Sequence, residues 1–262
     1  MNEYNEYLDF AKELAREAGD IMLKYFKPDI EQHYKADKTL VTVADEKINQ
    51  LVIDRVGQTY PEHSVLGEEA SNDKQAEYAW ICDPIDGTNP FAKGLPVSTF
   101  SLALTKDGCP IVGVIMDPFT NGLYWAAQDK GAYLNGEKIS VSDKELEFHS
   151  VIHVDWWPSA EIDTWWAMHE LAKELSIYTL SIGSIVRAAA MVASGKLEAG
   201  VFPGTKGKFM DIAAAKIIVE EAGGKVTNLF GNEQRYDQDI KGAIVSNGIC
   251  HAQLVEAINK TL

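Results

Sequence analysis

Two acidic residues three positions apart form the most distinctive pattern in the sequence. Asp83 and Asp86 lie in the motif DPIDGT at 83–88, which follows a short apolar run at 80–82. Because Pro84 fixes the backbone between the two acids, both carboxylates can point into the same space. Carboxylate and carbonyl oxygens are the ligands that Mg²⁺ prefers. The motif therefore indicates a magnesium site, with an ordinary Asp-Pro turn and a helix cap as the alternative.

The residues after Asp86 are suited to binding a phosphate group. Gly87 has no side chain, so a phosphate can approach its backbone closely. The N–H groups of Gly87 and Thr88 are expected to begin a helix and to donate hydrogen bonds to phosphate oxygens. Metal ligands and phosphate donors in one segment indicate an enzyme that acts on a phosphate.

Three further acids are weak candidates when each is considered alone. Glu68 lies in GEEAS at 67–71, which is ordinarily a solvated loop. Asp211 stands at the start of a helical pattern, and Asp45 follows Thr42 in a T-x-x-D capping box, so both have simple structural roles. Together with DPIDGT, and in this order along the chain, the three acids become candidates for the same site.

Composition and charge restrict the classes of function. The chain has 262 residues, of which 46% are hydrophobic, and a formal net charge of −15. This charge disfavours nucleic acids and anionic membranes as partners, and an acidic protein that binds phosphate needs metal cations. We expect neither a signal peptide nor a membrane span. The three cysteines are distant from one another and form no CxxC pair, which predicts free thiols in the cytoplasm.

The patterns along the chain predict the elements that must position these acids. Apolar residues at helical spacing predict helices at 4–27 and 43–58. Runs of apolar residues bounded by Asp-Gly and Asn-Gly turns predict an antiparallel meander with strands at 99–104, 111–116, 123–127 and 132–134. Helices and strands then alternate, with predicted helices at 160–175, 185–194, 211–222 and from 250, and strands at 177–181, 197–202, near 225 and at 242–246.

This order of elements predicts a layered αβαβα sandwich of the α+β class. We expect a single domain at 1–262, with two lobes at about 1–150 and 151–262. Two tryptophan pairs, at 156–157 and 165–166, could form a lid or a subunit contact, but we expect packing in the core or at an interface.

Taken together, the motifs resemble the inositol monophosphatase family of lithium-sensitive, magnesium-dependent phosphatases. The resemblance spans nearly the whole chain and rests on Lys35, VTVAD at 41–45, GEEAS, DPIDGT, Gly183-Ser184, VASG at 192–195 and MDIAAAKIIVEEAGG at 210–224. It implies a five-layered αβαβα fold and a homodimer. Relatives include fructose-1,6-bisphosphatases and 3′(2′),5′-bisphosphate nucleotidases.

The resemblance also implies a role for each matching residue. Two to three Mg²⁺ ions per active site would be held by Glu68, Asp83, the carbonyl of Ile85, Asp86 and Asp211. Thr88, hydrogen-bonded to Asp45, would orient and deprotonate the attacking water, with Glu68 as a further catalytic residue. The phosphate and the rest of the substrate would contact Lys35, Asp86, Gly87, Thr88, Gly183, Ser184, Ile185 and Asp211.

The sequence departs from the family pattern in three places. Pro90 replaces the usual Asn, Met210 replaces the usual Trp, and the stretch 203–208 lacks the usual acid and contains Lys206 and Lys208. That stretch is most simply a solvated loop. Alternatively, one of the two lysines binds a second anionic group, which would favour a bisphosphate.

Three functions remain open from the sequence. We expect Mg²⁺-dependent hydrolysis of a phosphate monoester of a small metabolite, inositol 1-phosphate first, by metal-activated water. The first alternative is a bisphosphate substrate, either fructose 1,6-bisphosphate or 3′-phosphoadenosine 5′-phosphate. The second is a non-catalytic regulatory binding protein on the same fold.

Overall fold

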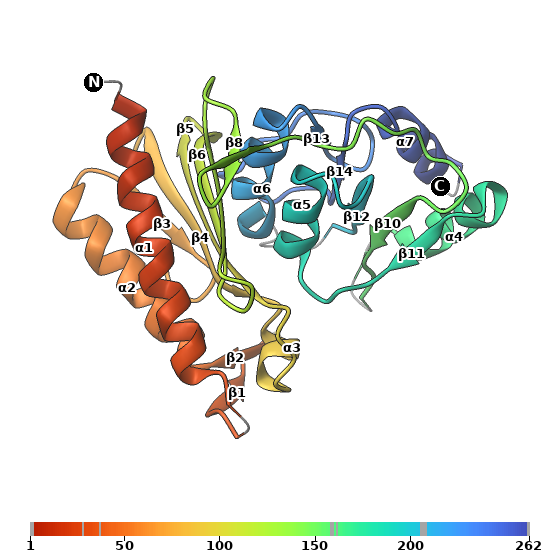
Figure 1. The fold of residues 1–262 in the computed structure, drawn as a ribbon. Coiled ribbons are helices and arrows are strands. Elements are labelled where there is room, and N and C mark those ends of the chain that lie inside the picture. The colour runs from red at the N-terminus through yellow and green to blue at the C-terminus, as the bar shows by residue number, and fades with distance from the viewer. Residues whose placement is uncertain are drawn as a thin grey trace.

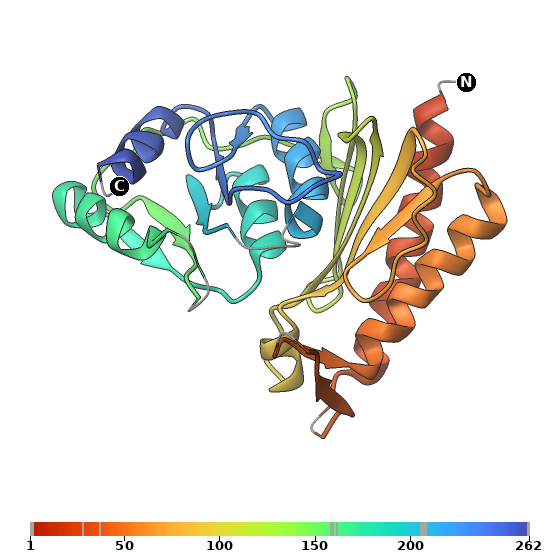
Figure 2. The same cartoon turned by 180° about the vertical axis from the view of Figure 1, so that it is seen from behind.

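Helices and sheets alternate in five layers (Figures 1 and 2). The computed structural model describes residues 3–27, 29–36, 38–157, 160, 162–204 and 209–260. The layers are, in order, a helix pair, a seven-stranded sheet, a second helix pair, a five-stranded sheet and a third helix pair. The three pairs are α1 (Glu3–Tyr25) with α2 (Val43–Thr59), α5 (Ile185–Ala193) with α6 (Phe209–Glu221), and α4 (Thr164–Leu175) with α7 (His251–Asn259). The predicted αβαβα sandwich is confirmed.

The seven-stranded sheet is antiparallel except at one edge. Its strands lie in chain order, and only β3 and β4 pair in parallel. The predicted meander is confirmed and is longer than expected. The strands are β3 (Ser64–Gly67), β4 (Tyr78–Asp86), β5 (Thr99–Lys106), β6 (Cys109–Asp117), β7 (Gly122–Ala127), β8 (Ala132–Leu134) and β9 (Glu137–Ile139).

The five-stranded sheet is mixed and has the order β11-β10-β12-β14-β13. Its strands are β10 (Val151–Val154), β11 (Tyr178–Leu180), β12 (Ala199–Phe202), β13 (Lys225–Thr227) and β14 (Ala243–Ser246). Here β10 is parallel to both of its neighbours. The predicted division into two lobes near residue 150 stays a prediction.

Two small elements lie beside each other at one end of the molecule. The hairpin of β1 (Gln32–Tyr34) and β2 (Leu40–Thr42) packs near the short helix α3 (Thr88–Ala92), and both views show this neighbourhood. The hairpin therefore brings the segment before α2 to the end of β4, where DPIDGT lies.

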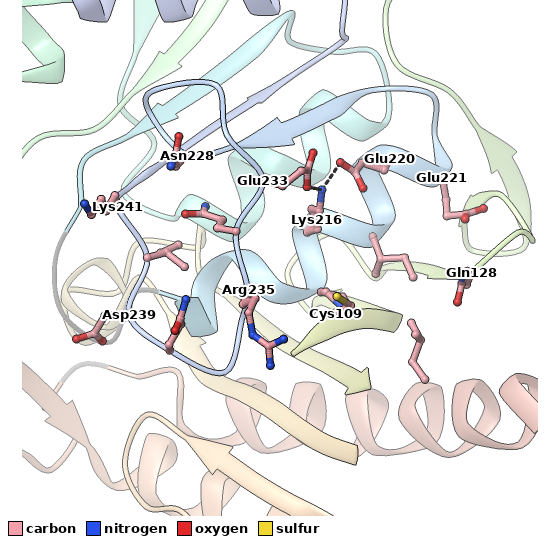
Figure 3. A pocket seen from close by; sticks show the side chains of 16 residues that line it. Cys109, Gln128, Lys216, Glu220, Glu221, Asn228, Glu233, Arg235, Asp239 and Lys241 are labelled. Carbon is pink, nitrogen blue, oxygen red and sulfur yellow. Dashed lines mark hydrogen bonds and ion pairs between the residues drawn. The ribbon is translucent and has the colours of Figure 1, made fainter. Parts of the chain in front are cut away.

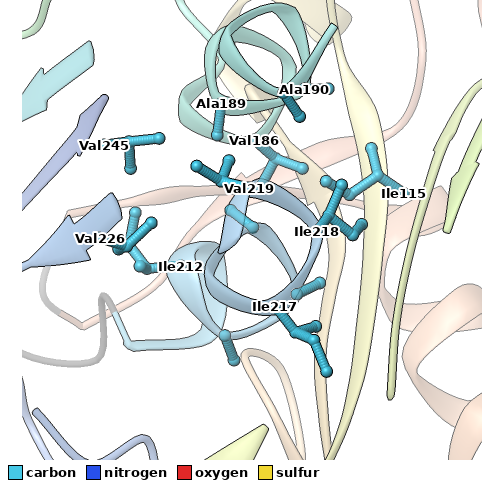
Figure 4. Packing of buried hydrophobic residues seen from close by; sticks show 14 of the residues in the cluster. Ile115, Val186, Ala189, Ala190, Ile212, Ile217, Ile218, Val219, Val226 and Val245 are labelled. Atoms are coloured by element: carbon cyan, nitrogen blue, oxygen red, sulfur yellow. The ribbon is translucent and has the colours of Figure 1, made fainter. Parts of the chain in front are cut away.

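Helix α6 is buried on all sides because it lies between the two sheets. Residues 211–219 are all buried, and Figure 4 shows Ile218 facing Ile115 of β6, with Val245 on the opposite side. At Gly113 of β6, an added Cβ would lie 2.6 Å from Ile217 Cγ2, so glycine permits this close approach of helix and sheet. This packing fixes the first turn of α6 relative to the sheet.

Some predictions about element ends and exposure were wrong. Helix α6 begins at Phe209, two residues before its predicted start, so Asp211 lies inside its first turn. Helix α4 begins at Thr164 because the side chain of Asp163 caps it, accepting a hydrogen bond from the N–H of Trp166. Three of the four tryptophans are about half exposed and so lie outside the core, namely Trp156, Trp165 and Trp166, and their packing at an interface stays a prediction. In the described part of the chain, no helix combines the length and apolarity that crossing a membrane requires.

His251 at the start of α7 should make the stability of the fold depend on pH. Its ring is buried between Thr227 Oγ1 and Ser246 Oγ, at 2.8 and 2.7 Å. Burial lowers the pKa of His251 to about 4. Below its unfolded pKa of about 6.5 the unfolded chain binds a proton that the folded chain excludes, so stability falls as the pH falls. We expect a loss of about 2 kcal/mol in the free energy of unfolding between pH 7 and pH 5.

Urea unfolding at the two pH values measures this loss. His251→Gln should reduce the difference, whereas His169→Gln, at an exposed position on α4, should leave it unchanged. An equal pH dependence in the wild type and His251→Gln would contradict the assignment.

Candidate metal centre

Three buried carboxylates meet between the end of β4 and the start of α6. Oxygens of Asp83, Asp86 and Asp211 lie within 4.8 Å of one another. Their residues are only 1, 6 and 1% exposed. Three negative charges this close in a poorly hydrated place repel one another strongly unless cations lie between them. Since all the side-chain donors are carboxylate oxygens, the set fits a hard divalent cation such as Mg²⁺.

A β-bulge allows both acids of β4 to face the same space. Successive side chains of a regular strand alternate between faces, so residues 83 and 86 would normally point in opposite directions. Here Asp83 pairs with Ser101 and Asp86 with Thr99, so three steps along β4 oppose two along β5. The extra residue restores a common direction. Asp83 Oδ1 also accepts a hydrogen bond from the N–H of Ile85 at 3.0 Å, which stabilises the irregular segment.

The start of α5 holds the carboxylate of Asp86. Ser184 is the N-cap of this helix, and its hydroxyl lies in hydrogen-bonding contact with Asp86 Oδ2. The N–H of Val186 donates to the same oxygen at 2.8 Å. Asp86 therefore satisfies donors at the first turn of α5, where negative charge is favoured. The predicted residues at 183–185 are brought to the metal ligands in this way.

Thr88 lies between the metal ligands and a second buried acid. Its Oγ1 is 3.3 Å from Asp45 Oδ1 and 3.0 Å from the carbonyl oxygen of Ile85. Burial raises the pKa of Asp45 to about 7, although hydrogen bonds from the hydroxyl and N–H of Thr42 act in the opposite direction. The predicted capping box at Thr42 and Asp45 is confirmed, and Asp45 Oδ1 contacts Thr88 while Oδ2 serves the cap.

Gly87 is required by a close backbone contact at the cavity. It is the N-cap of α3 and has φ +85°, in the left-handed region. A Cβ at this position would lie 2.7 Å from the carbonyl oxygen of Gly183. Only glycine therefore lets the end of β4 approach the segment before α5 so closely.

Lys35 pairs with two acids of the GEEAS segment. Its Nζ lies 2.8 Å from Glu69 Oε1 and 3.6 Å from Glu68 Oε1. Burial raises the pKa of Glu69, opposed by the hydrogen bond from Lys35. Burial also acts to lower the pKa of Lys35, but the nearby Glu68 and Glu69 outweigh it, so that pKa is raised overall. The predicted Lys35 is thus held by carboxylates beside the cavity.

A cavity of about 380 Å³ lies in front of these groups. Most of the predicted site residues line it, namely Glu68, Asp83, Ile85, Asp86, Gly87, Thr88, Gly183 and Ile185. Asp211, Ser184, Asp45 and Lys35 reach these residues through the contacts above. Lys206 and Lys208 lie outside the described residues.

Sequence reasoning missed part of the cavity wall. Asp155 and Trp157 follow β10 directly, and Lys38 comes from the turn between β1 and β2. A signal for Asp155 existed, since it follows a strand at its carboxyl end, where sheets with parallel strands commonly place ligands. Pro90 also lines the cavity; it is the third residue of α3, where a missing N–H is tolerated.

A second and larger cavity, of about 820 Å³, lies elsewhere, between the start of β6, the second half of α6 and the segment 228–241. Its charged groups largely pair with one another. Figure 3 shows Lys216 bonded to both Glu220 and Glu233. The convergence of carboxylates, and not the size of the cavity, therefore marks the candidate metal centre.

Fold and site together define a layered metal-dependent phosphatase, and comparisons with known proteins agree. The model of the Inositol monophosphatase family matches residues 3–262. The chain is 31% identical over 256 residues to a fructose-1,6-bisphosphatase/inositol-1-monophosphatase of Thermotoga maritima, covering 97% of this chain and 96% of that protein. It is also 31% identical to inositol monophosphatase 1 of Solanum lycopersicum, over 97% of this chain and 94% of that one.

A solved structure of the Thermotoga maritima IMPase superposes with a TM-score of 0.87 at 30% identity, covering 98% of each chain. The chain belongs to the inositol monophosphatase family. It is a phosphomonoesterase of that family, with a buried aspartate cluster consistent with metal binding.

Arg187 links the start of α5 to the seven-stranded sheet. Its Nη1 lies 2.9 Å from Asp117 Oδ2 and donates to the carbonyl oxygen of Pro96 at 3.3 Å. Since Asp117 is almost fully buried, Arg187→Ala should leave its carboxylate without this cation and cost about 1–3 kcal/mol of unfolding free energy.

Urea unfolding measures this cost. Arg16→Ala, at an exposed position on α1, is the control and should change stability by less than about 0.5 kcal/mol. An Arg187→Ala protein as stable as the control would show that the ion pair contributes nothing.

Divalent cations should stabilise the fold through Asp83, Asp86 and Asp211. With free Mg²⁺ near 100 times its dissociation constant, we expect the melting temperature to rise by roughly 5–10 °C relative to EDTA. Asp211→Asn removes one ligand charge and should lose most of this rise. Asp129→Asn, at an exposed position, should keep it. An unchanged rise in Asp211→Asn would place the bound cation elsewhere.

Proposed function

We propose that this phosphomonoesterase hydrolyses the phosphate monoester of a small polyol in the presence of Mg²⁺, with inositol 1-phosphate as the preferred substrate. The observation that carries the proposal is the cluster of Asp83, Asp86 and Asp211 beside Gly87 and Thr88. It supports a site that needs cations and that binds a dianionic group next to them.

The residues of the cluster and their neighbours would have the following roles. Two to three Mg²⁺ ions would be held by Glu68, Asp83, the carbonyl of Ile85, Asp86 and Asp211. When bound, Mg²⁺ offsets the repulsion between phosphate and carboxylates and lowers the pKa of the attacking water. The backbone N–H groups of Gly87 and Thr88 would bind phosphate oxygens.

Thr88 and Asp45 would orient and deprotonate the attacking water. The hydroxyl of Thr88 can donate to Asp45 Oδ1 and accept from the water, which supports a path for one proton. A carboxylate whose pKa burial raises to about 7 is a suitable acceptor, since a general base works best near the operating pH. The chain would then need no phosphorylated side chain, and phosphate would pass directly to water.

A bisphosphate substrate is the second candidate. One observation favours it, because the Thermotoga maritima relative is named as a fructose-1,6-bisphosphatase as well as an inositol-1-monophosphatase. Lys206 and Lys208 would bind the second phosphate under this reading. Lithium sensitivity, a homodimer and a cytoplasmic location stay predictions.

Phosphate release from a panel of substrates tests the proposal. We expect Mg²⁺-dependent hydrolysis of inositol 1-phosphate to exceed that of fructose 1,6-bisphosphate and of 3′-phosphoadenosine 5′-phosphate by about tenfold or more in kcat/KM. Asp86→Asn should lower the rate on every substrate by more than about 100-fold, and Asp129→Asn should not. A bisphosphate that leads the panel would replace the preferred substrate, and an active Asp86→Asn protein would refute the site.

A further inference from the structure

One buried carboxylate of the cavity has no part in the three-carboxylate cluster. Asp155 lines the same cavity as Asp83 and Asp86, from the opposite sheet, and its side chain is only 11% exposed. It comes directly after β10, at the carboxyl end of that strand. Since Asp155 lies outside that cluster, its carboxylate can contact another part of a ligand in the cavity.

The backbone of Asp155 is fixed on both sides. Its N–H donates to the carbonyl oxygen of Val201 at 3.1 Å, and its carbonyl oxygen accepts from Thr164 Oγ1 at 2.7 Å. These contacts tie the residue to β12 and to α4, so the side chain starts from a rigid position. Rigid placement is what a binding residue needs if it is to discriminate between substrates.

Two side chains lie against the carboxylate of Asp155 and fix its orientation. Ser181 Oγ donates to Oδ1 at 2.9 Å, and His153 Nε2 lies 2.8 Å from Oδ2. The N–H of Ile182 donates to His153 Nδ1 at 3.4 Å, which fixes the imidazole ring beside Asp155. Each carboxylate oxygen has two acceptor positions, and among the described residues each receives one side-chain contact. The other positions can accept from a ligand.

The neighbours of Asp155 suit a polyol better than an anion. Trp157 and Ile185 line the same cavity and offer an aromatic and an aliphatic surface to the carbon framework of a ring. A carboxylate accepts strong hydrogen bonds from hydroxyl groups and repels a phosphate. The cavity also contains Lys38, but this residue comes from the β1–β2 turn, outside the sheet that carries Asp155.

We propose that Asp155 binds hydroxyl groups of the leaving alcohol, and that it selects monophosphates of neutral polyols against substrates with a second phosphate at that end of the cavity. Ser181 and His153 act as positioning residues for it. The proposal rests on the function proposed above, because it assigns the substrate's phosphate to the cluster of Asp83, Asp86 and Asp211.

The test compares substrates that differ in their leaving groups. In Asp155→Asn, kcat/KM for inositol 1-phosphate should fall by about 10- to 100-fold, mainly through KM, since a charged hydrogen-bond acceptor is lost. The nitrophenyl group of p-nitrophenyl phosphate carries no free hydroxyl that could donate a hydrogen bond to Asp155. The kcat/KM for this substrate should therefore change less than about threefold. The preference for inositol 1-phosphate over fructose 1,6-bisphosphate should shrink.

Two further variants keep the test sharp if Asp155→Asn folds poorly. Ser181→Ala retains the carboxylate of Asp155 but removes one hydrogen bond that orients it. This variant should lose activity on inositol 1-phosphate selectively, by a smaller factor than Asp155→Asn. Glu198→Gln is the matched control, because this buried carboxylate holds the N–H of Val151 at 2.8 Å and is absent from the cavity wall. It should leave the ratio between the two monophosphates unchanged. The Mg²⁺-dependent rise in melting temperature reports that each variant keeps its fold and metal centre.

The outcomes separate this inference from the proposed function. Equal losses on inositol 1-phosphate and p-nitrophenyl phosphate would give Asp155 a general structural role and overturn the inference. Unchanged kinetics in both Asp155→Asn and Ser181→Ala would overturn it as well. If the wild type released no phosphate from any substrate with Mg²⁺, the proposed function itself would fail.

Discussion

The mutual repulsion of Asp83, Asp86 and Asp211 is the constraint on which the rest of the structure depends. Carboxylates within 4.8 Å of one another and almost without solvent would separate if the chain were free to move. They stay together because their backbones belong to the most deeply packed elements, β4 and α6. Bound cations would offset this repulsion, and metal binding would then be coupled to the stability of the fold.

The N-termini of two helices stabilise two acids of the site. Asp86 accepts from Ser184 and from the N–H of Val186 at the first turn of α5, and Asp45 accepts from Thr42 at the first turn of α2. In each case backbone and hydroxyl donors that a helix leaves unsatisfied are used to hold a carboxylate. The contacts of Asp86 also join β4 to α5, whereas those of Asp45 are local to the start of α2.

Local motifs made many candidate residues of the site predictable. The arrangements that depend on tertiary contacts could not be predicted from the sequence. DPIDGT, the capping box at Thr42 and Asp45, and the helix carrying Asp211 each have a pattern within a few residues. The bulge that turns Asp83 and Asp86 to one side depends on pairing with β5, which no local pattern encodes. Asp155 could not be predicted as a site residue because only the folded chain places it beside Ser181 and in the cavity wall. Likewise, Trp165 is exposed because α4 lies in an outer layer, which no local pattern indicates.

The carboxylates of the cavity differ in their neighbours, and this difference would let the two groups of acids bind different parts of a substrate. Asp83, Asp86 and Asp211 are close enough to share cations, so with metal bound that end attracts a phosphate. Asp155 lies outside that cluster, accepts a hydrogen bond from Ser181 Oγ and lies 2.8 Å from His153 Nε2. A substrate with one phosphate and several hydroxyls matches both ends in a single orientation. Under the two proposals, such matching would let a chain of net charge −15 bind an anion at one place in the cavity and reject a second anion at another.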